Sequence, residues 1–77
     1  MKILFFGRLG ETIGREIQFD LPKGGCTVAE LRAALAERHE GLAAQSVRAC
    51  IDREIAPESA LVLPTHEIAF IPPLSGG

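Results

Sequence analysis

The spacing of apolar residues along the 77-residue chain predicts four strands and one helix. Residues 2–6 are apolar on both faces of an extended segment, which is typical of a central strand, and Gly7 ends it. Residues 10–14 begin and end with glycine and carry the signals of a turn. Residues 15–21 then alternate polar with apolar side chains, so we expect a second strand with one buried face.

A helix is expected to begin at Thr27, because Thr27 and Glu30 fit the reciprocal capping box of a helix N-terminus. Gly41 is a natural stop for this helix. The side chains expected on its buried stripe are those of Val28, Leu31, Ala34 and Leu35. The side chains expected to face water are those of Arg32, Glu37 and Arg38.

The second half of the chain supplies two more strands. Residues 47–51 alternate apolar with polar side chains, residues 52–54 form a turn, and residues 67–71 form the last strand. The order strand, strand, helix, strand, strand predicts an α+β fold, in which a mixed sheet carries its main helix on one face. With no internal repeat or linker, residues 1–77 are expected to form one domain.

Composition narrows the class of protein. Apolar residues at 47% and charged residues at 23% describe an ordinary soluble globular domain. The net charge of −2 and the scattered Lys and Arg residues argue against a nucleic-acid partner. No apolar run approaches the roughly 20 residues of a membrane span, and no signal peptide is recognisable, so we expect a cytoplasmic protein.

Candidate metal, cofactor and redox residues are few. Cys26 and Cys50 have neither the spacing of metal ligands nor that of a CxxC redox motif. Their spacing alone does not exclude a disulfide between them, although thiols in the cytoplasm stay reduced. His39 and His66 show no ligand spacing either. We find no nucleophile–base pair and no carboxylate pair, so the chain is expected to bind no cofactor or metal and to be catalytically inert alone.

The most informative stretch is the C-terminus, residues 70–77, where an apolar strand meets two prolines and then a Gly-Gly end. Pro72 and Pro73 lack the N–H group that a strand ladder needs, so the last six residues, 72–77, should leave the sheet as a tail. The four residues 74–77 span at most about 13–14 Å when extended, the depth of a typical active-site tunnel. The residues expected to enter a partner are Pro73, Leu74, Ser75 and Gly76.

A partner surface follows from the alternation of side chains in the central strands. If the odd-numbered residues of the first strand face the helix, then Leu4, Phe6, Ala69 and Ile71 lie on the opposite face, which no second helix covers. An exposed apolar patch on a small soluble domain is typical of a protein interface. With Ile55 from the neighbouring hairpin, Phe6 and Ile71 are the predicted interface residues.

Four stretches together resemble the ubiquitin-like β-grasp sulfur carriers, and most closely the small subunit of molybdopterin synthase. They are the opening Ile3-Leu4-Phe5-Phe6-Gly7, the helix start Thr27-Val28-x-x-Leu31, the strand Val47-x-Ala49-x-Ile51-Asp52, and the end Ile71-Pro72-Pro73-x-Ser75-Gly76-Gly77. They span nearly the whole chain. The terminal motif is the most specific of the four.

The resemblance implies a chemistry for the tail. In such carriers an ATP-dependent, E1-like activating enzyme adenylates the C-terminal carboxylate, here that of Gly77, and a sulfur donor converts it to a thiocarboxylate. The loaded tail then enters the large catalytic subunit of molybdopterin synthase, where sulfur passes to a pterin precursor in molybdenum cofactor biosynthesis. ATP is therefore used by the partner, and this chain is the non-catalytic, sulfur-donating subunit of a transferase complex.

Other functions share the same end of the chain. The alternatives are a sulfur carrier for thiamine thiazole, tRNA thiolation or cysteine synthesis, and a ubiquitin-like protein modifier joined to lysines through Gly77. A binding module whose tail is never activated is a further alternative. The sulfur donor, the identity of the activating enzyme and the number of pathways served are not encoded in the pattern.

Overall fold

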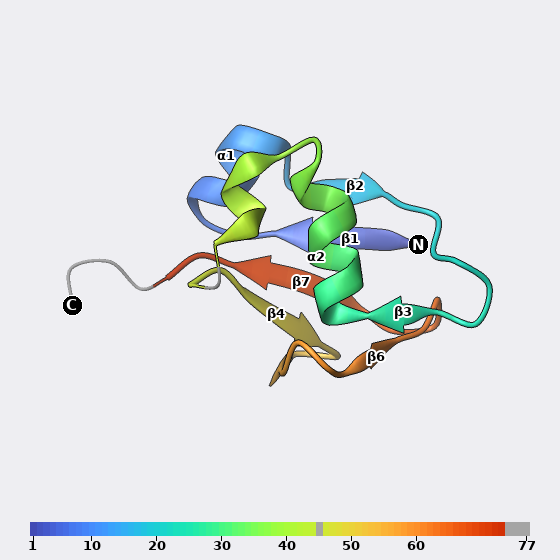
Figure 1. Cartoon of the computed structure of the whole chain (residues 1–77). Helices are drawn as coiled ribbons and strands as arrows, with labels where there is room; N and C mark the ends of the chain where they lie inside the picture. The colour runs from blue at the N-terminus through green and yellow to red at the C-terminus, as the bar shows by residue number, and fades with distance from the viewer. Residues whose placement is uncertain (45, 74–77) are drawn as a thin grey trace.

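The computed structural model describes residues 1–44 and 46–73, and over these the predicted α+β architecture is confirmed. A five-stranded mixed sheet has the order β2-β1-β7-β4-β5, and the helix α2 crosses one face of it (Figure 1). The helical elements are α1 (Arg8–Ile13), α2 (Val28–Ala36) and the 3₁₀ helix η1 (Glu40–Ala43). The strands of the sheet are β1 (Lys2–Phe5), β2 (Glu16–Gln18), β4 (Arg48–Ile51), β5 (Glu54–Ala56) and β7 (Ile68–Ile71).

A second, two-stranded sheet was not predicted. It pairs β3 (Cys26–Thr27) with β6 (Leu61–Val62), two segments too short to show a period in the sequence. Gly25, just before β3, has φ +85°, and a Cβ there would lie 2.2 Å from the carbonyl oxygen of Val62. Only glycine therefore allows the two backbones to approach this closely.

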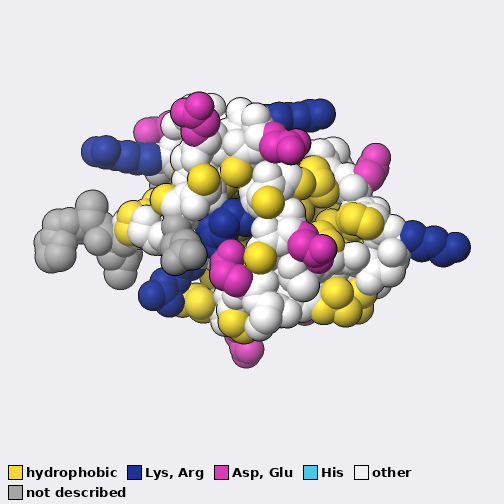
Figure 2. All heavy atoms as spheres, in the orientation of Figure 1, with side chains coloured by type: hydrophobic (Ala, Val, Ile, Leu, Met, Phe, Trp, Pro, Cys, Tyr) yellow, Lys and Arg dark blue, Asp and Glu magenta, His cyan; other side chains and the backbone are white. Residues whose placement is uncertain are grey.

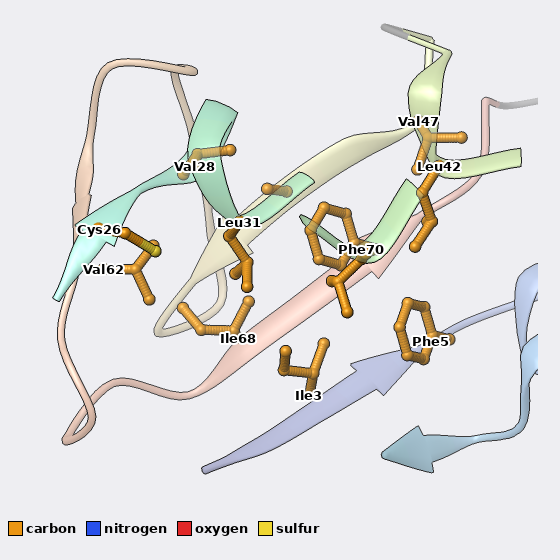
Figure 3. Close-up of a cluster of buried hydrophobic side chains, with 12 residues drawn as sticks. Ile3, Phe5, Cys26, Val28, Leu31, Leu42, Val47, Val62, Ile68 and Phe70 are labelled. Carbon is orange, nitrogen blue, oxygen red and sulfur yellow. The ribbon is translucent and has the colours of Figure 1, made fainter. Parts of the chain in front are cut away.

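The centre of the main sheet is the parallel pair of β1 and β7, which aligns Ile3 with Ile68 and Phe5 with Phe70. All four side chains are at most 2% exposed. They face Leu31 of α2, and the rings of Phe5 and Phe70 stack with centroids 5.8 Å apart (Figure 3). The predicted direction of the odd and even positions in these strands is thus confirmed.

The predicted start of α2 is also confirmed. The Thr27 hydroxyl accepts a hydrogen bond from the Glu30 N–H at 3.1 Å, and the Thr27 N–H donates to Glu30 Oε1 at 2.8 Å. The predicted end was wrong, because α2 stops at Ala36 and Gly41 lies inside η1.

The predicted turn at residues 10–14 was wrong, because residues 8–13 form the helix α1. Gly10 serves here for close packing and not for a turn. A Cβ on Gly10 would lie 2.9 Å from the carbonyl oxygen of Phe5, so the missing side chain lets α1 rest against the end of β1. The second strand is also shorter than the predicted residues 15–21, since β2 spans three residues.

The placement of Arg32 on the wet side of α2 was wrong as well. Arg32 is 6% exposed and forms two hydrogen bonds to the Glu58 carboxylate, from Nε at 2.9 Å and from Nη2 at 2.8 Å. Its Nη1 donates to the carbonyl oxygens of Leu42 and Ala44, both at 3.0 Å. The guanidinium also lies 5.7 Å from the centroid of the Phe70 ring. These contacts satisfy a buried cation and tie α2 to the loops on both sides.

Leu35→Ala should lower the free energy of unfolding by about 2–5 kcal/mol, because it leaves a cavity beside core side chains. Leu35 is 2% exposed, whereas Leu61 is 52% exposed and provides a matched control. Denaturant titration should show a change within about 0.5 kcal/mol for Leu61→Ala. A loss below about 1 kcal/mol for Leu35→Ala would contradict its place in the core.

A second expectation concerns pH. The hydrogen bonds from Arg32 lower the pKa of the Glu58 carboxyl below its usual value, against an opposing effect of burial. Glu58 therefore stabilises the fold fully above its unfolded pKa of about 4.3, and this contribution is lost as pH falls through the lower folded pKa. The difference in unfolding free energy between the parent and Glu58→Gln should be constant near neutrality and shrink in acid.

The control for this pH effect is Glu54→Gln, which removes an exposed carboxylate from β5. Its difference from the parent should stay small at every pH. Denaturant titrations between neutral and acidic pH measure both differences. A pH-independent difference for Glu58→Gln would show that the Arg32–Glu58 pair does not contribute as described.

Candidate functional site

The C-terminal ends of β1 and β7 lie side by side, because the two strands are parallel (Figure 1). The Phe6 N–H donates to the Phe70 carbonyl oxygen at 3.1 Å, and beyond this bond the strands separate. β7 ends at Ile71, immediately before the two prolines, as predicted. We call Pro72 and Pro73 the tail root.

The predicted tail is described only at its root. Pro72 is half-buried and Pro73 is exposed. The other predicted tail residues, Leu74, Ser75 and Gly76, lie outside the described residues, as does Gly77, the predicted site of adenylation and thiocarboxylate formation. Their roles remain predictions.

The side of the sheet turned away from α2 is named here the open face. Its residues include Leu4, Phe6, Arg48, Cys50, Ile55, Ala69 and Ile71. The strand registers place Leu4 opposite Ala69, Ala69 opposite Cys50, and Cys50 opposite Ile55. A row of apolar or weakly polar side chains therefore crosses four strands. On the opposite, helix-bearing side, charged side chains of both signs are interspersed with hydrophobic ones (Figure 2).

Two members of this row are less accessible than predicted. Ala69 is 6% exposed and Cys50 is 9% exposed, because larger cross-strand neighbours flank these small side chains. The expectation that Ala69 contributes to an exposed patch was therefore wrong. The row is exposed mainly at its edge, where Ile55 is 58% exposed.

The three predicted interface residues all lie on the open face, but around two separate hollows. Ile55 and Ile71 line a groove of about 420 Å³ together with Arg48 and the tail root. Phe6, which is 50% exposed, lines a second hollow of about 530 Å³ beside α1. The tail root thus emerges from an apolar groove, with Phe6 on the far side of β7.

Arg48 is a part of this groove that sequence reasoning missed. It lies opposite Ile71 in the register of β4 and β7, and its side chain is exposed. Among residues 1–44 and 46–73, no carboxylate lies within 4.0 Å of its guanidinium. The alternation of side chains in residues 47–51 predicted that Arg48 lies on the polar side of its strand. Only the register of β4 on β7 shows that this side adjoins the tail root.

The described residues offer little chemistry of their own. Burial, and then the nearby Glu30 carboxylate, raises the pKa of the Cys26 thiol, which keeps it protonated and unreactive at neutral pH. Both cysteines are free and buried. Within residues 1–44 and 46–73, no three His, Cys, Asp or Glu side chains come together as a metal site, and no helix could cross a membrane.

The fold is that of a ubiquitin-like β-grasp protein: a small mixed sheet carries one main helix on a single face, and its last strand, β7, lies at the centre of the sheet. The sequence matches the ThiS family over residues 3–77, and the chain belongs to that family. The fold is that of ThiS-type sulfur carriers and ubiquitin-like modifiers, which are not themselves catalytic.

Solved structures agree with this assignment. SAMP1 from Haloferax volcanii is 25% identical, with a TM-score of 0.78 over 99% of this chain and 97% of that one. A putative molybdopterin converting factor subunit 1 from Pyrococcus furiosus is 19% identical, with a TM-score of 0.79 over 95% of each chain. The likeness to the Pyrococcus furiosus protein shows a shared fold and nothing about function.

Proposed function

We propose that the chain is the sulfur carrier subunit of molybdopterin synthase. The observation that supports this most directly is the position of the tail root. β7 ends immediately before two prolines, which line an apolar groove of the open face. The first of them, Pro72, lies four residues before Gly76, where the Gly-Gly end begins. The groove that we propose as part of the partner surface therefore adjoins Pro72 and Pro73, the start of the proposed tail.

The chemistry starts from an unreactive group, because the Gly77 carboxylate is an anion at neutral pH and repels nucleophiles. An ATP-dependent activating enzyme joins it to AMP with release of pyrophosphate. A sulfur donor then forms the C–S bond as the C–O bond to the phosphate breaks and AMP leaves. The resulting thiocarboxylate donates its sulfur to a pterin precursor in the large subunit of molybdopterin synthase.

In this scheme the chain itself supplies reach, access and docking. Glycines at 76 and 77 would leave a tunnel unobstructed, because glycine has no side chain and accepts backbone conformations that other residues avoid. Phe6, Ile55 and Ile71 bury apolar surface against the partner, while Pro73, Leu74, Ser75 and Gly76 enter its active site. The acid–base groups belong to the partners.

A second candidate is a ubiquitin-like modifier, in which the activated Gly77 carbonyl is attacked by a lysine amine. The likeness to SAMP1, another of whose structures is described as small archaeal modifier protein 1, favours it. A sulfur carrier for thiamine thiazole, tRNA thiolation or cysteine synthesis uses the same thiocarboxylate. Intact mass after incubation with the activating enzyme, ATP and a sulfur donor distinguishes a sulfur carrier from an unactivated tail, because sulfur replaces one oxygen, whereas a modifier would appear as a covalent adduct with a lysine-bearing protein. The acceptor then distinguishes the pathways.

Deleting Gly77, or adding one residue after it, should abolish sulfur transfer. The deletion shortens the reach by about 3.5 Å, and misplacement of about 1 Å can cost a reaction roughly a hundredfold. Thermal stability should stay within about 0.5 kcal/mol of the parent, since no packed core side chain is removed. Thiocarboxylate formation and dithiolene production in a reconstituted assay measure the effect. Loading and transfer at the parental rate by either variant would exclude the sulfur-carrier function.

Phe6→Asp should weaken binding to the large subunit by about 3 kcal/mol, roughly a hundredfold in Kd, because it buries an unpaired carboxylate in the contact. Leu61→Asp is the matched control, since Leu61 is equally exposed but belongs to the small β3–β6 sheet. Calorimetry should show near-parental affinity for this control and an intact fold for both variants. Equal affinities for the two variants would remove Phe6 from the interface.

A further inference from the structure

The backbone of Gly7 and the ring of Pro72 are in contact where β1 and β7 separate. Gly7 has φ +59° and ψ −140°, a conformation that residues with an L side chain rarely adopt. A Cβ built on Gly7 would lie 2.9 Å from Cγ of Pro72 and 3.5 Å from Cδ. The Cβ of an L-residue at position 7 must therefore displace the Pro72 ring.

The Pro72 ring cannot give way as a flexible side chain would. Its Cδ is bonded to the backbone nitrogen, and the ring fixes φ near −65°. Puckering of the ring can shift Cγ alone, and any larger displacement of the ring moves the backbone at residue 72. Upstream, the hydrogen bond from Phe6 to Phe70 fixes the ends of the two strands relative to each other. The Gly7–Pro72 contact thus constrains the chain at the tail root, one residue after the end of β7.

We infer that Gly7 is a positioning residue for the tail: its bare Cα seats Pro72 and so sets the direction in which the C-terminal residues leave the sheet. This role rests on the proposed function, since direction matters only if the Gly77 carboxylate must reach a reaction centre. A tail with a fixed root loses less conformational freedom when it enters a partner than one with a free root.

A purely local role for Gly7 is the competing explanation, because positive φ alone penalises L-residues. The two explanations separate by stereochemistry. The mirror image of Gly7's conformation, φ −59° and ψ +140°, is an ordinary extended conformation for an L-residue, so D-alanine adopts the Gly7 backbone angles without backbone strain. D-alanine also carries its methyl group on the side of Cα opposite to the one that meets Pro72.

The first measurement tests the contact itself. A chain of 77 residues is accessible to chemical synthesis, so the parent, Gly7→Ala and a chain with D-alanine at position 7 can be compared. Nuclear Overhauser effects should connect the Hα protons of residue 7 with the Pro72 ring in the parent and in the D-alanine protein, and should be lost in Gly7→Ala. Their absence from the parent would overturn the inference whatever the chain's function is.

The second measurement tests the consequence. At saturating activating enzyme, Gly7→Ala should slow thiocarboxylate formation by about tenfold or more, while KM changes little, because docking through the open face is retained. D-alanine at position 7 should restore most of the rate. Equal rates for the L- and D-alanine proteins, or an effect confined to KM, would overturn the positioning role.

A double-mutant cycle separates the Pro72 contact from backbone strain. Pro72→Ala removes Cγ and Cδ, the two ring atoms that a side chain at position 7 would meet. If Gly7 acts through Pro72, the double variant Gly7→Ala/Pro72→Ala should be loaded as fast as Pro72→Ala alone. If the two residues act independently, the rate loss of the double variant should be the product of the two single losses. Multiplied losses would contradict the inference.

The experiments distinguish failure of the proposed function from failure of the positioning role of Gly7. If the parent keeps the Gly7–Pro72 contact but is never loaded with sulfur, the sulfur-carrier function fails and the positioning role fails with it. If the parent is loaded and Gly7→Ala is loaded at the parental rate, only the positioning role fails. Denaturant titration of each protein confirms that the rates compare folded chains.

Discussion

The parallel pairing of β1 with β7 is the constraint on which the rest of the structure depends. Its register buries Ile3, Phe5, Ile68 and Phe70 against α2, and the pleat then directs their neighbours to the open face. A shift of one residue would exchange these two sets of side chains. Because parallel strands end at the same edge, this register also brings Gly7 next to Pro72. The core, the open face and the position of the tail root are therefore consequences of one pairing.

The helix stays on this sheet partly through a buried cation. Arg32 loses its hydration, and this cost is offset only because its donors reach Glu58 and the carbonyl oxygens of Leu42 and Ala44. These groups belong to segments that bear little regular structure of their own. The same guanidinium lies over Phe70, at the centre of the sheet. The hydrogen bonds of Arg32 thus hold the connections between helices and strands in place, in a small domain whose apolar core is limited.

The fold class was predictable because local signals agreed with the final structure. The capping box at Thr27 and the two-sided apolar run before Gly7 are both local, and both were right. The errors share a non-local cause. Arg32 is buried because Glu58, 26 residues away, meets it, and Gly10 permits helix packing against Phe5 where a turn was expected. Arg48 could not be assigned to the groove without the register of β4 on β7. The roles of residues 74–77 stay predictions, since they lie outside the described residues.

The proposed function divides the work of sulfur transfer between this chain and its partners. In that proposal, the energy that activates the Gly77 carboxylate comes from ATP bound by a partner. What the domain can control is where the carboxylate is delivered. In the proposed function, docking of the open face fixes the body on the partner, the tail root sets the starting point and direction, and the number of residues after Pro73 sets the depth. None of these three quantities depends on the acceptor, so the same scaffold suits both proposed functions, sulfur transfer and protein modification, and the partner's active site would decide between them.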